Sequence, residues 1–139
     1  MLPLLESLAR TIEQEILITG TIALPGFPPV RRNALRASSS PYQGLCHIAV
    51  AKLQDNLRQQ APDLRMRVLS FEYAERNGNV PAGKSAWERG RHVIAEVIAP
   101  EGTYLVDPTI RQFLPEAKSV YGPGEIYPLQ MVQRSIIRR

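Results

Sequence analysis

The fold that the sequence predicts depends on residues 91–107, which read RHVIAEVIAPEGTYLVD. Two β-rich runs flank residues 99–102, where proline at the second place and glycine at the fourth suit a tight turn. We therefore expect strands over 91–98 and 103–107 that fold back on each other as an antiparallel hairpin.

The register of this hairpin decides whether His92 and Asp107 can meet. If the loop holds an even number of residues, Ile94 faces Asp107, and His92 lies diagonally next to Asp107 on the same face. The Cα atoms of diagonal neighbours are about 7–8 Å apart, within reach of an imidazole and a carboxylate. An odd loop or a bulge at Gly102 would put the two side chains on opposite faces.

Upstream, the only cysteine of the chain, Cys46, lies where a loop, residues 38–45, runs into an apolar helical stretch, residues 46–53. Unpaired amides and the positive end of the dipole at a helix N-terminus stabilise a thiolate and can receive an oxyanion. The order Cys46, His92, Asp107 on helix, strand and strand is the strongest functional signal in the chain. It predicts a nucleophile, a base and a residue that orients the base.

Each of these residues has a defined chemical role. The Cys46 thiolate attacks a carbonyl carbon, and the His92 imidazole takes the thiol proton and returns it to the leaving amine. The Asp107 carboxylate fixes the tautomer of His92 and stabilises the imidazolium. The Cys46 amide and the side chain of Gln43 are the candidate oxyanion donors.

Structural roles remain open for the same residues. Cys46 can be a small buried hydrophobe, and His92 can be satisfied by a backbone carbonyl. Asp107 precedes Pro108 and can simply end its strand. His47 is the competing base, but adjacent helical residues do not face each other, which keeps its ring away from the Cys46 sulfur.

The remaining segments complete an α+β fold. Apolar residues spaced three or four apart over 4–17 predict an amphipathic helix, and residues 66–73 predict a further strand. The proline-rich residues 20–41 are expected to form a wrapping loop. Residues 126–137 are expected to add one more strand or edge. The central helix, beginning at Cys46, should pack on a small antiparallel sheet.

The composition fits one domain without a cofactor. A chain of 139 residues with 44% hydrophobic residues can bury one core, so we expect a single domain over 1–139. A lone cysteine forms no internal disulfide, which favours the cytoplasm, and we expect no signal peptide or membrane span. One cysteine and two histidines in this spacing match no closed metal site, and we expect neither a metal nor another cofactor.

The net charge of +4 is carried by arginine more than by lysine. An arginine-rich surface favours an acidic partner protein, so a non-catalytic protein-binding module on the same scaffold is the alternative to an enzyme. No basic run is interleaved with aromatic residues, which disfavours nucleic acid as a partner. Membrane contact is not expected either.

Three segments resemble the papain-like and transglutaminase-like cysteine superfamily: GLC at 44–46, RHVIAEV at 91–97 and YLVDPT at 104–109. The chain is most similar to the small papain-fold toxin domains of bacterial polymorphic toxin systems. The resemblance implies a papain-like fold and amide chemistry on proteins: peptide hydrolysis, glutamine deamidation or acyl transfer. It also implies delivery into a target cell and a cognate immunity or inhibitor protein.

The sequence departs from secreted papain-type proteases, because it lacks their Cys-Gly-Ser-Cys-Trp run, their disulfides and an asparagine as third member. It is also too short for the acetyl-coenzyme A pocket of arylamine acetyltransferases. We therefore expect a cysteine-dependent amide hydrolase that acts on a protein. A glutamine side chain is the preferred substrate, which makes the chain a deamidase, and a peptide bond is the next choice.

Overall fold

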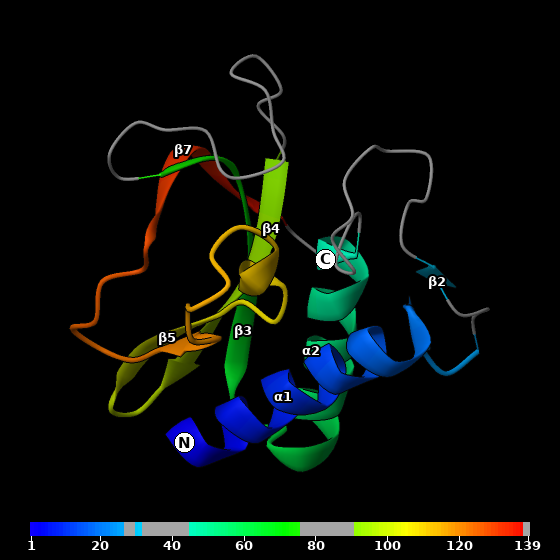
Figure 1. Ribbon diagram of the computed structural model, residues 1–139. Coiled ribbons are helices and arrows are strands. Elements are labelled where there is room, and N and C mark those ends of the chain that lie inside the picture. Colours follow the sequence, from blue (N-terminus) through cyan, green and yellow to red (C-terminus); the bar gives the residue numbers. More distant parts are fainter. Residues whose placement is uncertain (27–29, 32–44, 76–90, 138–139) are drawn as a thin grey trace.

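The computed structural model describes residues 1–26, 30–31, 45–75 and 91–137 (Figure 1). Within these residues the chain forms two α-helices and a five-stranded antiparallel sheet, together with a separate pair of two-residue strands. The α+β class predicted from the sequence is therefore confirmed.

Both helices occur where the apolar spacing predicts them. Helix α1 (Leu2–Thr19) has a proline in its first turn and ends at Gly20, whose φ of 69° provides the left-handed cap that favours glycine. Helix α2 (Cys46–Gln60) begins at the expected cysteine and ends just before Pro62. Each helix buries one apolar face, formed by Leu5, Leu8, Ala9, Ile12 and Ile16 in α1 and by Ala49, Val50, Leu53 and Leu57 in α2.

The five strands are arranged in the order β6-β5-β4-β3-β7, and every neighbouring pair is antiparallel. The segment expected to be a strand or an edge is an edge strand, which pairs with β3. Of the segment expected to wrap around the fold after α1, the described residues 20–26 and 30–31 include two strands of two residues each. The bounds are β1 (Thr21–Ile22), β2 (Val30–Arg31), β3 (Arg65–Glu75), β4 (Arg91–Ala99), β5 (Gly102–Val106), β6 (Val120–Tyr121), β7 (Leu129–Ile137) and the 3-10 turn η1 (Ile110–Gln112).

The β4–β5 hairpin has the predicted even loop. Ile98 pairs with Thr103, and the ladder continues without a bulge to Ala95 and Val106. Strand β5 ends at Val106, one residue earlier than the sequence predicts, so Asp107 is the first residue after the strand. Its backbone N–H donates to Ser119 O at 2.8 Å, which fixes the residue beside the start of β6.

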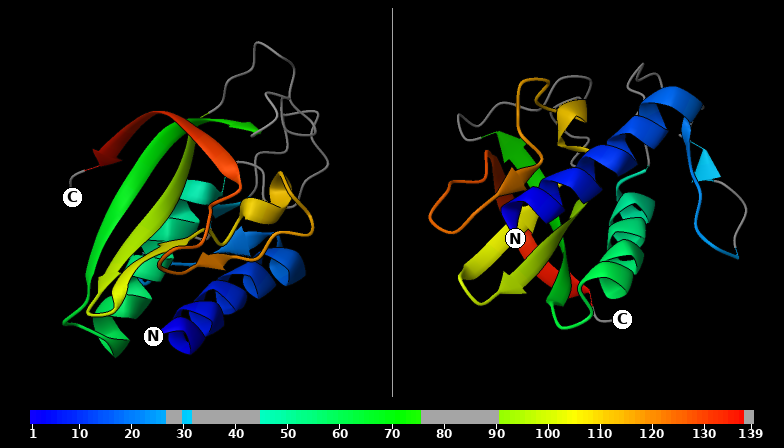
Figure 2. Two further views of the ribbon diagram at one scale, coloured as in Figure 1. Left: turned by 90° about the vertical axis from the view of Figure 1, so that its left-hand side faces the viewer. Right: turned by 90° about the horizontal axis from the view of Figure 1, so that it is seen from below.

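The two faces of the sheet bury two separate apolar clusters. Because side chains alternate along a strand, Val93, Ala95 and Val97 pack under the helices, and α1 and α2 both cover this face (Figure 2). On the second face, Ile94 and Phe71 pack against the aromatic residues Phe113, Tyr121 and Tyr127 and their aliphatic neighbours. The sheet is thus buried on both sides near the middle of β4.

The second face is covered in part by residues 122–128. This segment connects β6 to β7, which lie at opposite edges of the sheet, and places Tyr127 over Phe71 with ring centroids 6.1 Å apart. It also brings Pro123 close to the β4–β5 turn, where Gly102 has a φ of 142°. The path of residues 122–128 past the turn therefore requires a glycine at position 102.

We expect Gly102→Ala to lower the free energy of unfolding by about 2–4 kcal/mol, because a Cβ would meet Pro123 and an L-residue disfavours this φ. The added atom would lie 2.6 Å from Pro123 Cγ. Urea unfolding measures the change. The matched control is Gly124→Ala, since Gly124 also has a positive φ, of 82°, but open space around its Cα. Equal losses in the two variants would contradict the close approach.

Candidate catalytic site

A buried histidine–carboxylate pair lies at the hairpin. His92 Nε2 is 2.8 Å from Asp107 Oδ2, and the two side chains are 1% and 0% exposed. His92 is the second residue of β4, and Asp107 follows β5, so the hairpin register brings them together. The predicted contact between these two residues is confirmed.

Asp107 receives two further hydrogen bonds, which the sequence does not predict. The Tyr127 hydroxyl donates to Asp107 Oδ2 at 2.5 Å, and the Thr109 backbone N–H donates to Oδ1 at 3.2 Å. The Thr109 bond is the local turn that aspartate commonly forms with the backbone two residues on. A carboxylate without contact with water needs such donors, because burying it unpaired costs several kcal/mol.

Two aromatic rings fix the orientation of the His92 imidazole. Phe71, directly opposite on β3, meets it edge to face at a centroid distance of 5.6 Å, and Phe113 does so at 4.9 Å. Such perpendicular contacts restrict rotation of the ring about its side-chain bonds. The imidazole therefore keeps Nε2 directed at Asp107.

Cys46 is the first residue of α2 and is partly buried. The helix begins without a side-chain cap, because its N-cap residue is Leu45, and the first helical bond is from Ala49 N–H to Leu45 O at 2.9 Å. The Cys46 side chain interacts with the His92 imidazole and is one of the groups that raise its pKa. Cys46 packs against the apolar cluster under the helices, whereas Phe71 and Phe113, the two rings that contact His92, belong to the cluster on the second face of the sheet. The thiol and the imidazole therefore meet at the boundary between the two clusters.

The surroundings of His92 favour its charged form. Burial, the largest single effect, lowers the pKa of His92, but the Asp107 charge, the hydrogen bonds to Asp107 and Cys46 and the Cys46 charge together raise it from 6.5 to about 9. Burial and the nearby Asp107 charge also raise the pKa of Tyr127 well above its ordinary value of 10.0. His92 is therefore an imidazolium at neutral pH, and Tyr127 remains a hydrogen-bond donor.

Helix α2 and strand β4 carry further polar side chains. His47 is exposed on α2, as expected for a neighbour of Cys46 that points away from the sheet. Glu96 faces Arg67 across β3 and β4 and accepts a hydrogen bond from its Nε at 2.8 Å. Gln43, the expected oxyanion donor, lies outside the described residues.

Within the described ranges, no group of three or more His, Cys, Asp or Glu side chains is arranged to hold a metal ion. The helices in those ranges are also too short or too polar to cross a membrane.

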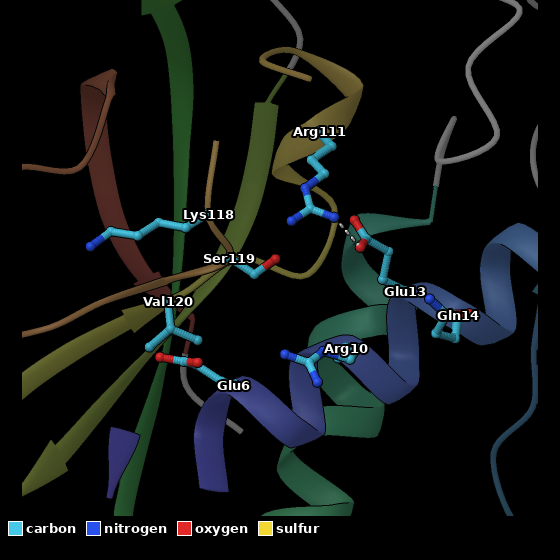
Figure 3. Close-up of a pocket in the computed structure, with 8 residues that line it drawn as sticks. All are labelled: Glu6, Arg10, Glu13, Gln14, Arg111, Lys118, Ser119 and Val120. Carbon is cyan, nitrogen blue, oxygen red and sulfur yellow. Dashed lines mark hydrogen bonds and ion pairs between the residues drawn. The ribbon is translucent and has the colours of Figure 1, made fainter. Parts of the chain in front are cut away.

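A pocket of about 350 Å³ lies between α1 and residues 111–120 (Figure 3). An ion pair crosses it, from Arg111 Nη1 to Glu13 Oε1 at 2.6 Å, and Arg10 and Lys118 add positive charge to its lining. None of Cys46, His92 and Asp107 lines this pocket. It is therefore a charged surface feature separate from the thiol.

We expect the His92–Asp107 pair to make the stability depend on pH. The pKa of His92 in the folded chain, about 9, lies above the unfolded value of 6.5. The contribution of His92 to the free energy of unfolding is therefore complete below pH 6.5 and is lost as the pH rises through 9. The loss amounts to about 3 kcal/mol, at about 1.4 kcal/mol for each pKa unit. Urea unfolding between pH 6 and 9.5 should show that the advantage of the wild type over His92→Gln shrinks accordingly. A difference that does not change with pH would contradict this.

The chain matches no protein-family model, no curated protein and no solved structure. The resemblance to papain-like and transglutaminase-like enzymes therefore stays a prediction from sequence motifs. What the site does has to be inferred from the geometry of Cys46, His92 and Asp107.

Proposed function

We propose that the chain is a cysteine-dependent amide hydrolase that acts on a protein substrate through Cys46, His92 and Asp107, on a papain-like scaffold. The observation that carries the proposal is the contact of the Cys46 thiol, at a helix N-terminus, with an imidazole that a buried carboxylate holds in place. A nucleophile, a base and a group that orients the base are the three parts that acyl-transfer chemistry needs.

In the resting state His92 carries a proton beside the Cys46 sulfur. The pKa of His92 is about 9, so a cation lies beside the sulfur at neutral pH. That cation and the positive end of the α2 dipole both favour the ionised thiol. The Asp107 carboxylate balances the charge of the imidazolium. Without this paired charge, burying the imidazolium away from water would cost too much free energy.

The reaction proceeds in two halves. The Cys46 Sγ lone pair forms a bond to the amide carbon, and the carbonyl oxygen becomes an oxyanion held by the Cys46 N–H and the proposed donor Gln43. The C–N bond breaks as His92 gives its proton to the nitrogen, which leaves as ammonia or an amine. Water, deprotonated by His92, then attacks the thioester, releasing a carboxylic acid and restoring the thiolate.

The burial of the three side chains supports a side-chain amide as substrate. Cys46 is partly exposed, whereas the side chains of His92 and Asp107 are 1% and 0% exposed. A substrate therefore meets mainly the sulfur end of the triad, which suits a glutamine side chain projecting from a folded protein. We accordingly place glutamine deamidation first and peptide-bond cleavage second. A toxin or effector role, with a cognate inhibitor protein, follows from the sequence resemblance alone.

The second candidate is a non-catalytic protein-binding module. The charged pocket beside α1 supports it, because Arg10 has no ion-pair partner among the described residues and extends the positive charge of Arg111. An acidic surface of a partner protein could pair with such a guanidinium. In that case Cys46 would be a structural residue.

We expect iodoacetamide to alkylate native Cys46 at pH 6 about 10–100-fold faster than a free thiol, since the positive charge of the neighbouring imidazolium favours the reactive thiolate form over the thiol. His92→Gln should abolish the advantage, and Asp107→Asn should reduce it. Mass spectrometry of the alkylated chain over a pH series gives the rates.

His47→Gln is the matched control, because it removes the exposed imidazole next to Cys46 and should leave the rate unchanged. Slow alkylation of the wild type, with the same rate in His92→Gln, would contradict the enzyme proposal and favour the binding module. With a reactive thiol established, ammonia release from glutamine-containing proteins separates deamidation from cleavage, which yields shorter fragments instead.

A further inference from the structure

Two donors converge on a single oxygen of Asp107. His92 Nε2 and the Tyr127 hydroxyl lie 2.8 Å and 2.5 Å from the same Oδ2 atom, while the Thr109 amide contacts Oδ1. Tyr127 is itself only 5% exposed and packs edge to face on Phe71 and Tyr121. The phenol is thus held on the oxygen that also faces the imidazole.

A hydrogen bond donated to a carboxylate oxygen withdraws part of its negative charge. At Oδ2 this charge is what stabilises the His92 imidazolium. The Tyr127 hydroxyl keeps its proton over the whole useful pH range, because burial and the Asp107 charge raise its pKa well above 10.0. Its effect on Asp107 is consequently constant rather than a switch.

We propose that Tyr127 is a positioning residue that weakens the hold of His92 on its proton by sharing the negative charge of Asp107 Oδ2. The inference rests on the proposed hydrolase function, in which His92 must both keep a proton beside the thiolate and give it to a leaving amine. A base whose pKa lies far above the working pH is a poor donor in the second step. Tyr127 moderates the aspartate so that the same imidazole serves both steps.

The charged and titratable groups that face His92 in the described structure come from three elements. Asp107 follows β5, Cys46 begins α2, and Tyr127 lies on the connection between β6 and β7. The remaining ring neighbours, Phe71 and Phe113, carry no charge. Within the described residues, Asp107 is the charged group that forms hydrogen bonds with both His92 and Tyr127.

Tyr121 provides a matched control for Tyr127. Its ring packs against Tyr127 at a centroid distance of 5.5 Å, and it is buried to a similar extent, 7% against 5% exposed. Burial and the Asp107 charge raise the pKa of Tyr121 too, but its hydrogen bond is to the Lys118 backbone and not to Asp107. Removing its hydroxyl therefore disturbs the packing without removing a donor from Oδ2.

The test is an NMR titration of the two histidines in protein carrying labelled imidazoles, with His92→Gln assigning the resonances. We expect Tyr127→Phe to raise the pKa of His92 by about 0.5–1 unit, because Asp107 then presents its full charge. Tyr121→Phe should leave it within the error of the wild type. Equal shifts in both variants, or none in Tyr127→Phe, would overturn the inference.

A second replacement keeps the fold and reverses the sign. Difluorotyrosine at position 127 retains the ring and the hydrogen bond but is a more acidic phenol, and so a stronger donor. It should lower the pKa of His92, whereas a purely structural role of Tyr127 would give no shift. A shift in the same direction as Tyr127→Phe would also contradict the proposal.

The titration separates this inference from the proposed function, because it needs no turnover. If Tyr127→Phe moves the pKa of His92 but Cys46 alkylation is slow and independent of His92, the hydrolase proposal fails, while the effect of Tyr127 on the His92 proton stands. If alkylation is fast and depends on His92 while both Tyr127 replacements leave its pKa unchanged, only the present inference fails.

Discussion

The arrangement of this chain depends on satisfying one buried carboxylate. Asp107 has no contact with water, and a bare charge there would cost several kcal/mol. Its partners come from three separate parts of the chain: His92 from β4, the Thr109 amide from the following turn, and Tyr127 from the connection to the last strand. The hairpin register and the path of residues 122–128 are both needed to bring these donors to it.

The sheet separates two kinds of core, and the thiol lies at their boundary. Aliphatic residues of α1 and α2 cover one face, and aromatic residues dominate the other. The aliphatic side places the start of α2, and with it Cys46, while the aromatic side fixes the His92 ring through Phe71 and Phe113. Each core positions one member of the thiol–imidazole pair, so the geometry of the pair depends on how both cores pack.

Local patterns in the sequence account for the hairpin and for the contact of His92 with Asp107. Pro100 and Gly102 define an even loop, and the loop sets the register. The position of β7 beside β3 could not be predicted, because the pattern of residues within a strand does not indicate which distant strand it pairs with. Tyr127 was missed for the same reason: a tyrosine in a proline-flanked connection has no local feature that links it to an aspartate twenty residues earlier.

The connection between the two edge strands also gives the structure an order of assembly. Cys46, His92 and Asp107 all precede Tyr127 and β7 in the chain. Strand β3 pairs with β4 and with β7, so its second set of hydrogen bonds forms only after β7 has docked. Pairings so distant in sequence form late, because a long loop must close before they contribute. Until then the aromatic face is incomplete and Asp107 lacks its phenol donor. Docking of the last strand thereby completes the surroundings of Asp107, and a partly synthesised chain carries Cys46, His92 and Asp107 without their final environment.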